Sequence, residues 1–173
     1  MQDQLQLPDN LSKKDVFEKV KDYITHCGLE TTNMDDNRPW GGFYYISETQ
    51  TERFIDLFFQ DVDIAHIHIS EKLSPKILIV EPHKRLSWQY HLRRAEIWKV
   101  IAGTVNVVVS DDDEQRNMVE KQTNEVIILR KEQRHRLIGS DGWGIIAEIW
   151  QHTHPHHPSD EDDIIRVQDD FGR

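Results

Sequence analysis

The sequence has very little cysteine: Cys27 is the single one among 173 residues. One thiol excludes an internal disulfide and suits a reducing compartment. Basic residues are also scarce, since 21 lysines and arginines stand against 31 aspartates and glutamates, for a formal net charge of −10. Nucleic acids and anionic membrane surfaces are bound by basic patches. The charge balance therefore predicts no nucleic acid and no membrane among the partners.

Long hydrophobic runs are missing as well. No stretch approaches the roughly 18 apolar residues of a membrane-spanning helix. The first residues lack the basic and apolar regions of a secretory signal, so we expect a cytoplasmic protein. What the chain does contain is enough residues for one domain with a sizeable core, together with ten histidines.

The N-terminal part predicts one amphipathic helix. Ser12 followed by Asp15 is a helix-start signal, and Gly28 is a suitable stop. We expect the apolar stripe of this helix to pack against the outside of a core. The stripe recurs at helical spacing and consists of Val16, Phe17, Val20, Tyr23 and Ile24.

Beyond residue 40 the pattern changes to short runs rich in Val, Ile, Phe, Tyr and Trp, with turn signals between them. Many short strands at close spacing predict a sandwich or barrel. The polar segment 151–163 is expected to be a loop, and residues 164–173 a short helix or a tucked tail. The expected strands are 42–47, 54–59, 65–69, 76–80, 86–90, 97–101, 104–109, 125–129, 135–138 and 145–150.

Residues 89–96 carry the most informative chemistry. Because side chains alternate along a strand, Gln89 and His91 face the same way, and Glu96 opens the next strand after a short turn. His135 opens a later β-type run. An amide oxygen, imidazoles and a carboxylate that converge on one point suit a divalent metal such as zinc, iron, cobalt or manganese. Open coordination positions in such a site are typical of catalysis.

This arrangement resembles the cupin superfamily. The first cupin motif has a His-x-His pair, a Glu and a Gly, and these positions are taken here by Gln89, His91, Glu96 and Gly103. The second motif supplies one more histidine, which is His135 in this chain. Gln in place of the first histidine is what phosphomannose isomerases show.

The resemblance extends to the type II phosphomannose isomerase domain, which is also found C-terminal in mannose-1-phosphate guanylyltransferases. It rests on Arg-Pro-Trp-Gly at 38–41, Leu-Ser-Trp-Gln-Tyr-His at 86–91, Arg-Ala-Glu-Ile-Trp at 94–98 and Glu-Asp-Asp-Ile-Ile-Arg at 161–166. The chain departs from the pattern at Arg93, where many members carry a histidine. It also lacks the usual Pro and Gly within 130–134, before the second-motif histidine. Residues 49–75 are longer than the usual connection, so we expect an extra hairpin there.

The resemblance implies an all-β fold, a double-stranded β-helix or cupin jelly roll, with an N-terminal α-helix. Residues 1–37 would be the helical extension and residues 38–173 the cupin domain. It also implies an aldose–ketose isomerase that interconverts mannose 6-phosphate and fructose 6-phosphate. One divalent metal would be held by Gln89, His91, Glu96 and His135. Zinc is the expected metal, with cobalt, iron, manganese and nickel as alternatives, and a homodimer is the expected assembly.

A sugar phosphate partner needs cations around its phosphate. Lys76 and Arg94 are the candidate catalytic residues, and Arg38, Trp40 and Arg173 are the candidate substrate-binding residues. In so acidic a chain, the four cations should line one pocket. Two alternatives stay open: a non-catalytic sugar-binding cupin, and an isomerase or epimerase of another sugar phosphate. The group that moves the proton is not assigned.

Other polar clusters are expected to be ordinary surface. His66 and His68 should alternate on a strand. The histidines at 152, 154, 156 and 157 fall in the expected loop. The acidic runs 111–114 and 160–163 should be solvated turns, since neither has the spacing of a calcium-binding loop.

Overall fold

The first helix forms where the sequence predicts it. In the computed structural model, which describes residues 5–8 and 10–172, α1 spans Lys13–His26. The Ser12 hydroxyl accepts a hydrogen bond from the Asp15 backbone N–H and caps the helix. Gly28 follows in a left-handed conformation, with φ of 71°. Four apolar residues of the predicted stripe are buried, at Val16, Phe17, Val20 and Ile24.

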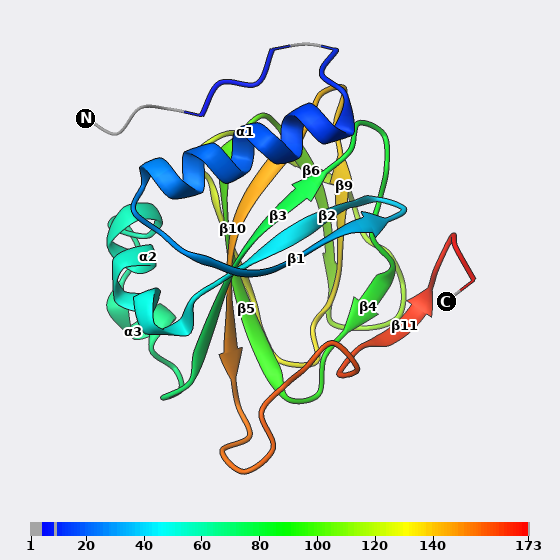
Figure 1. Cartoon of the computed structure of the whole chain (residues 1–173). Helices are drawn as coiled ribbons and strands as arrows, with labels where there is room; N and C mark the ends of the chain where they lie inside the picture. Colours follow the sequence, from blue (N-terminus) through cyan, green and yellow to red (C-terminus); the bar gives the residue numbers. More distant parts are fainter. Residues whose placement is uncertain (1–4, 9, 173) are drawn as a thin grey trace.

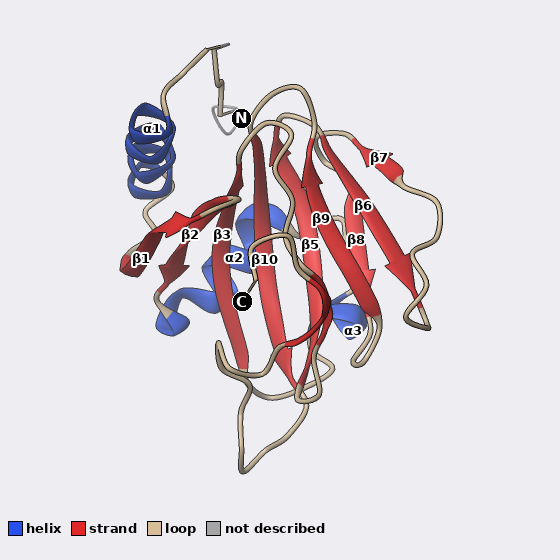
Figure 2. Ribbon diagram, turned by 90° about the vertical axis from the view of Figure 1, so that its right-hand side faces the viewer, coloured by secondary structure: helices blue, strands red, loops and turns tan. Residues whose placement is uncertain are grey.

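The strands form two antiparallel sheets that face each other (Figures 1 and 2). One sheet has the order β1-β2-β3-β10-β5-β8 and the other β11-β4-β9-β6-β7. The predicted all-β jelly roll with an N-terminal helix is thereby confirmed. The strands are β1 Thr31–Arg38, β2 Gly41–Ile46, β3 Leu73–Val80, β4 Trp88–Tyr90, β5 Arg94–Ala102, β6 Val105–Ser110, β7 Val119–Lys121, β8 Val126–Leu129, β9 Arg134–Gly139, β10 Gly144–His152 and β11 Ile165–Gln168.

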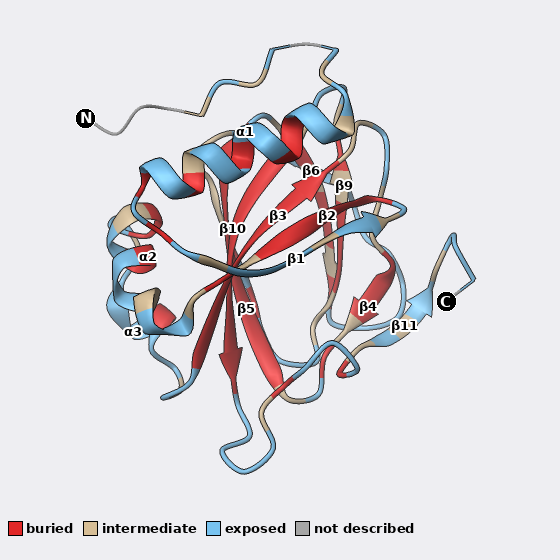
Figure 3. Ribbon diagram, in the orientation of Figure 1, coloured by how far each residue is buried: buried red, intermediate tan, exposed pale blue. Residues whose placement is uncertain are grey.

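Two apolar cores flank the six-stranded sheet. Its outer face packs against the helices, so β3, β5 and β10 are buried along their whole length (Figure 3). Its inner face packs against the second sheet through residues such as Trp98, Val100 and Ile146. Alternation along the strands assigns each residue to one face. At β3, β10 and β5, Lys76, Glu148 and Trp98 lie side by side in register.

Three predicted elements between residues 49 and 75 are wrong. The segments 54–59 and 65–69, expected as strands, lie in α2 (Thr51–Phe58) and in and just after α3 (Ile64–Ile67), and a short 3-10 helix, η1 (Glu48–Gln50), precedes them. The apolar residues Phe54, Ile55 and Phe58 recur at helical spacing and pack against the outer core. The expected hairpin is therefore a helical segment, and His66 and His68 do not alternate on a strand.

Three strands were not expected, and all are short or polar. β1 reads Thr-Thr-Asn-Met-Asp-Asp-Asn-Arg and lies at a sheet edge, and β7 has three residues. Residues 165–168, expected as helix or tail, form β11 beside β4. The division at residue 37/38 stays a prediction, and β1 runs across it. Among the described residues, no helix is long and apolar enough to cross a membrane.

Candidate metal centre

The four predicted metal ligands come from three strands and meet inside the barrel. Gln89 of β4 is the register partner of His135 of β9, His91 directly follows β4, and Glu96 lies in β5. All four are buried. Gln89 and His91 face the same way, as the alternation predicts, since Gln89 Nε2 lies 3.5 Å from His91 Nε2. The strands β4 and β9 belong to one sheet, and β5 belongs to the other.

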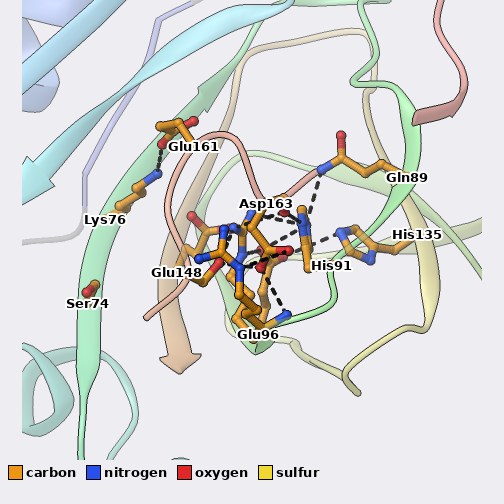
Figure 4. Close-up of polar contacts among 12 residues, drawn as sticks. Ser74, Lys76, Gln89, His91, Glu96, His135, Glu148, Glu161 and Asp163 are labelled. Atoms are coloured by element: carbon orange, nitrogen blue, oxygen red, sulfur yellow. Dashed lines mark hydrogen bonds and ion pairs between the residues drawn. The ribbon is translucent and has the colours of Figure 1, made fainter. Parts of the chain in front are cut away.

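Three of these side chains point toward one another (Figure 4). His91 Nε2 lies 3.2 Å from Glu96 Oε1, and His135 Nε2 lies 3.5 Å from Glu96 Oε2. One ligand atom from each residue fits within 4.8 Å of the others. The cluster of His91, Glu96 and His135 could thus hold a metal ion.

The hydrogen bonding of the cluster fits a metal. His91 Nδ1 lies 2.6 Å from the Asp163 carbonyl and His135 Nδ1 lies 2.9 Å from the Gln133 carbonyl. Each Nδ1 therefore donates its proton outward and leaves the Nε2 lone pair facing the cluster. Glu96 Oε2 and His135 Nε2 are buried and have no hydrogen-bond partner within the described part of the chain. A buried polar atom left unsatisfied is costly, and a metal ion would satisfy both.

Protonation also favours a cation here. Burial lowers the pKa of His91 to about 3, against the pull of the Glu96 charge, and burial lowers the pKa of His135. Burial alone would raise the pKa of Glu96, but His91 and Arg94 outweigh it and lower this pKa to about 2. At neutral pH the cluster presents two neutral imidazoles and one carboxylate, which is the form that binds metals.

Gln89 is present at the cluster with its nitrogen inward. Its Nε2 lies 3.5 Å from His91 Nε2, while its Oε1 accepts a hydrogen bond from the Ser87 hydroxyl. Amides ligate metals through oxygen. Gln89 would become a ligand only after its amide turned by half a rotation.

Beside the cluster lies a small cavity of about 60 Å³. Lys76, Arg94 and Arg38, three of the four predicted cations, line it together with Trp40. The expectation that the cations share one pocket therefore holds for these three. The fourth, Arg173, falls outside the described residues. Trp40 is also part of the inner core and stacks near Phe43, with ring centroids 6.3 Å apart.

A carboxylate of the chain occupies the cationic part of this cavity. Glu161 Oε1 lies 2.5 Å from Lys76 Nζ and 2.5 Å from the Tyr45 hydroxyl. Its Oε2 lies 3.9 Å from Arg38. Burial lowers the pKa of Lys76, and the charges of Glu148 and Glu161 oppose this decrease. This corner is built to hold an anion.

Arg94 joins the candidate metal cluster to Ser159, in the segment that follows β10. Its Nε donates to Glu96 Oε1 at 2.7 Å, and its NH2 lies 3.1 Å from His91 Nε2. Its NH1 donates to the Ser159 hydroxyl at 2.8 Å. The guanidinium lies 3.7 Å from the ring centroid of Trp150. Residues 153–164, here called the C-terminal strap, are therefore tied to the site.

The acidic end of the strap is not the solvated turn expected for 160–163. Asp163 is buried, and its carboxylate accepts hydrogen bonds from the backbone N–H groups of Leu92 and Arg93 and from the Ser159 hydroxyl. Its carbonyl is the one that orients His91. The strap therefore holds His91, a candidate metal ligand, in place.

His152 likewise does not lie in the expected loop, because β10 extends to it. It is buried, and its Nε2 lies 2.7 Å from the Ser74 hydroxyl. Its Nδ1 accepts a hydrogen bond from the Ser159 backbone N–H at 2.9 Å. The residue thus anchors the start of the strap to β3.

A family model described as mannose-6-phosphate isomerase C-terminal matches residues 28–169. The chain belongs to this family. Alginate biosynthesis protein AlgA of Pseudomonas aeruginosa is 30% identical over 162 residues, which cover 92% of this chain and 27% of AlgA. The chain therefore spans about a quarter of the length of that relative. The predicted resemblance to a cupin-type phosphomannose isomerase domain is confirmed.

Solved structures agree on the fold. A variant of oxalate decarboxylase from B. subtilis matches with a TM-score of 0.54 at 12% identity. The match covers 79% of this chain and 30% of the decarboxylase chain. Vicilin from Corylus avellana (hazelnut) matches with a TM-score of 0.52 at 14% identity, over 75% of this chain and 34% of its own. At such identities these likenesses show the fold alone.

The departures from the isomerase-family pattern have structural explanations. Arg93, where many members carry a histidine, donates to the Pro158 carbonyl at 2.7 Å and to Asp160 at 2.9 Å, and so holds the strap. Glu132 takes a left-handed conformation, with φ of 63°, in the turn before His135. Glycine favours this left-handed conformation. Glu132 adopts it here, so the turn keeps its shape although it contains no glycine.

Sequence reasoning missed three polar residues of this isomerase-family site: Glu148, Glu161 and Asp163. Glu161 and Asp163 sit in a polar run whose composition looks solvated. Glu148 left a signal, because it is the single charged residue in the otherwise apolar run 145–150. Counting by twos places Glu148 on the same face as Trp150 and Ile146, the face that points inward.

Proposed function

We propose that this domain is a metal-dependent aldose–ketose isomerase that interconverts mannose 6-phosphate and fructose 6-phosphate. The observation that carries the proposal is the buried cluster of His91, Glu96 and His135, with two unsatisfied ligand atoms, beside a cavity lined by cations. Membership of the mannose-6-phosphate isomerase C-terminal family supports the sugar.

His91, Glu96 and His135 would hold the metal, with Gln89 as a fourth ligand through its oxygen. A divalent ion bound there supplies a Lewis acid that polarises a sugar carbonyl and stabilises developing negative charge. We propose zinc, with cobalt, iron, manganese or nickel as alternatives, because imidazole and carboxylate ligands suit all of them.

Lys76 and Arg38 would bind the phosphate, in the corner where Glu161 lies now. The cavity of about 60 Å³ is far smaller than the roughly 300 Å³ of ordinary ligand sites. Glu161 and the strap must therefore withdraw when a sugar phosphate enters. Arg94 would keep Glu96 and His91 in position, since it contacts both.

The test combines metal analysis with a coupled assay of fructose 6-phosphate formation. We expect one equivalent of divalent metal in the wild-type protein, its loss in His91→Ala, and turnover by the wild type alone. His83→Ala, a substitution at an exposed histidine, is the matched control and should keep both properties.

Other outcomes separate the alternatives. Bound metal without turnover of mannose 6-phosphate would point to another sugar phosphate. Absence of metal in the wild-type protein after purification and after zinc addition would refute the isomerase and favour a non-catalytic sugar-binding cupin.

A further inference from the structure

The cavity contains a buried carboxyl group that has no part in the ligand cluster. Glu148 lies in the middle of β10, with Lys76 of β3 and Trp98 of β5 as its register partners. It is 4% exposed. A carboxyl group is rarely buried to this extent without a partner or a purpose.

The side chain of Glu148 is held in place and faces the cavity. Trp98 Nε1 donates a hydrogen bond of 2.9 Å to Glu148 Oε1. The side chain lines the same cavity as Lys76, Arg94 and Glu96. In Figure 4 it lies between Lys76 and the cluster of His91, Glu96 and His135. A sugar whose phosphate contacts Lys76 and whose carbonyl faces the metal cluster would pass in front of it.

Charged groups surround Glu148 on several elements. Lys76 faces it from β3, Arg94 and Glu96 face it from β5, and Glu161 reaches Lys76 from the strap. Burial and the Glu96 charge raise the pKa of Glu148 to about 8, against the opposing effect of Lys76 and Arg94.

The other ionisable groups of the cavity are less suited to this task. Glu96 belongs to the ligand cluster, and Glu161 is engaged by Lys76 and Tyr45. Arg94 does not lose its proton in a protein. Lys76 is needed as a cation for the phosphate. Among the described residues lining the cavity, Glu148 remains as the proton carrier.

We propose that Glu148 moves the proton between C1 and C2 of the sugar, an inference that rests on the proposed isomerase function. Its carboxylate takes the proton from C2 of the aldose phosphate. The C–H bond pair becomes the C1=C2 double bond, and the carbonyl oxygen at C1 gains a proton from water. The hydroxyl at C2 then loses its proton to water as C2=O forms, and C1 takes back the proton held by Glu148.

The test compares Glu148→Gln and Glu148→Asp with the wild type. Gln keeps an oxygen acceptor for Trp98 but cannot accept the sugar proton. We expect Glu148→Gln to lower kcat by about 10²- to 10⁴-fold, with KM changed no more than about threefold and metal content unchanged. Exchange of the C2 proton with deuterated water should slow by the same factor, and Glu148→Asp should recover part of both rates.

Glu81→Gln is the matched control, because Glu81 pairs with Lys13 at 2.9 Å outside the cavity. It should leave kcat unchanged. Turnover by the wild type together with a kcat of Glu148→Gln within about tenfold of it would overturn this role and leave the isomerase standing. Absence of wild-type turnover with metal bound would overturn both the role of Glu148 and the proposed isomerase function. If Glu148→Gln loses metal, Glu148→Asp decides: a kcat at least about tenfold lower with metal retained supports the role, and an unchanged kcat overturns it.

Discussion

Lys76 shows what a buried cation needs in this fold. It is 2% exposed, and its ammonium lies 3.5 Å from the ring centroid of Trp150 and 4.4 Å from that of Tyr45. Aromatic faces and the carboxylate of Glu161 replace the water that the ammonium has lost. An incoming phosphate would find a charge that is already desolvated and held in place.

Lys76→Met should therefore impair substrate binding more than turnover. We expect KM for the sugar phosphate to rise at least about tenfold, since a buried charge-assisted contact is worth a few kcal/mol. Steady-state kinetics measure it. Lys99→Met is the control, because Lys99 faces Asp61 at 3.9 Å on the outer side of the sheet. An unchanged KM in Lys76→Met would remove this residue from the phosphate site.

Protonation of His152 at acid pH should lower the stability of the protein, because the neutral ring anchors the strap. Burial and the Lys72 charge lower its pKa to about 4, and its Nδ1 must stay unprotonated to accept from the Ser159 N–H. The unfolded chain, with a histidine pKa near 6.5, binds more protons between pH 6.5 and 4. The contribution of neutral His152 to stability is therefore complete above pH 6.5 and is lost as the pH falls to about 4.

His152→Gln should flatten this part of the pH dependence. Between pH 7.5 and 4, the wild-type protein should lose up to about 3 kcal/mol more of its free energy of unfolding than the variant. Urea unfolding of the wild type and the variant, with metal removed by a chelator, measures the difference. His91 and His135 are present in both proteins, so their contribution to the pH dependence cancels. Parallel pH curves would contradict it.

At the scale of elements, the turn before β9 shows how the site keeps its geometry with an unusual sequence. The Glu132 backbone N–H donates to the His91 carbonyl at 3.0 Å, and Gln133 N–H closes the turn on the Arg130 carbonyl at 3.0 Å. Glu132 occupies the third position of this turn with φ of 63°. A residue with a Cβ is strained there, whereas glycine is not.

Glu132→Gly should therefore raise the free energy of unfolding by about 0.5–1 kcal/mol. Lys131→Gly, one residue earlier and outside the left-handed region, should lower it by a similar amount. Denaturant unfolding of the two variants measures both signs. A loss of stability in Glu132→Gly would show that its backbone N–H or side chain contributes more than the strain costs.

Element prediction succeeded where burial and pattern agreed. The largely apolar strands β3, β5 and β10 are buried on both faces, and their predicted bounds lie within a few residues of the observed ones. The polar edge strand β1 was missed, because Asp and Asn disfavour strands and only pairing with β2 makes it one. The segment 54–59 was misassigned because composition outweighed its helical spacing.

At the scale of the whole molecule, the candidate metal cluster joins both sheets. His135 and Gln89 come from the five-stranded sheet, and Glu96 comes from the six-stranded one. Any ion that binds the folded cluster and not the unfolded chain stabilises the entire barrel.

Zinc at about one hundred times its dissociation constant should thus stabilise the wild type by about 2.7 kcal/mol. For a chain of this size that corresponds to a rise in Tm of about 5–10 °C. Thermal unfolding with and without zinc measures it. His135→Ala should show no rise, while His83→Ala should behave as the wild type. An equal rise in His135→Ala would place the ion elsewhere.

The placement of the site was largely predictable, and its surroundings were not. Local spacing placed Gln89, His91 and Glu96 together, and the resemblance added His135 from 39 residues further on than Glu96. The contacts of Glu161, Ser159 and Asp163 depend on the strap returning across the barrel end from more than 60 residues away. No local pattern encodes such a return.

The Glu161 carboxylate is in effect a tethered competitor for the anion site. Under the proposed function, a substrate would not meet an empty site but one already occupied by a group whose local concentration is set by the short strap. The apparent affinity for substrate then equals the intrinsic affinity multiplied by the fraction of molecules in which the strap is withdrawn. A closed form favoured by about 2.8 kcal/mol would weaken that affinity about a hundredfold, and shortening or loosening the strap would tune it without any change to the catalytic groups.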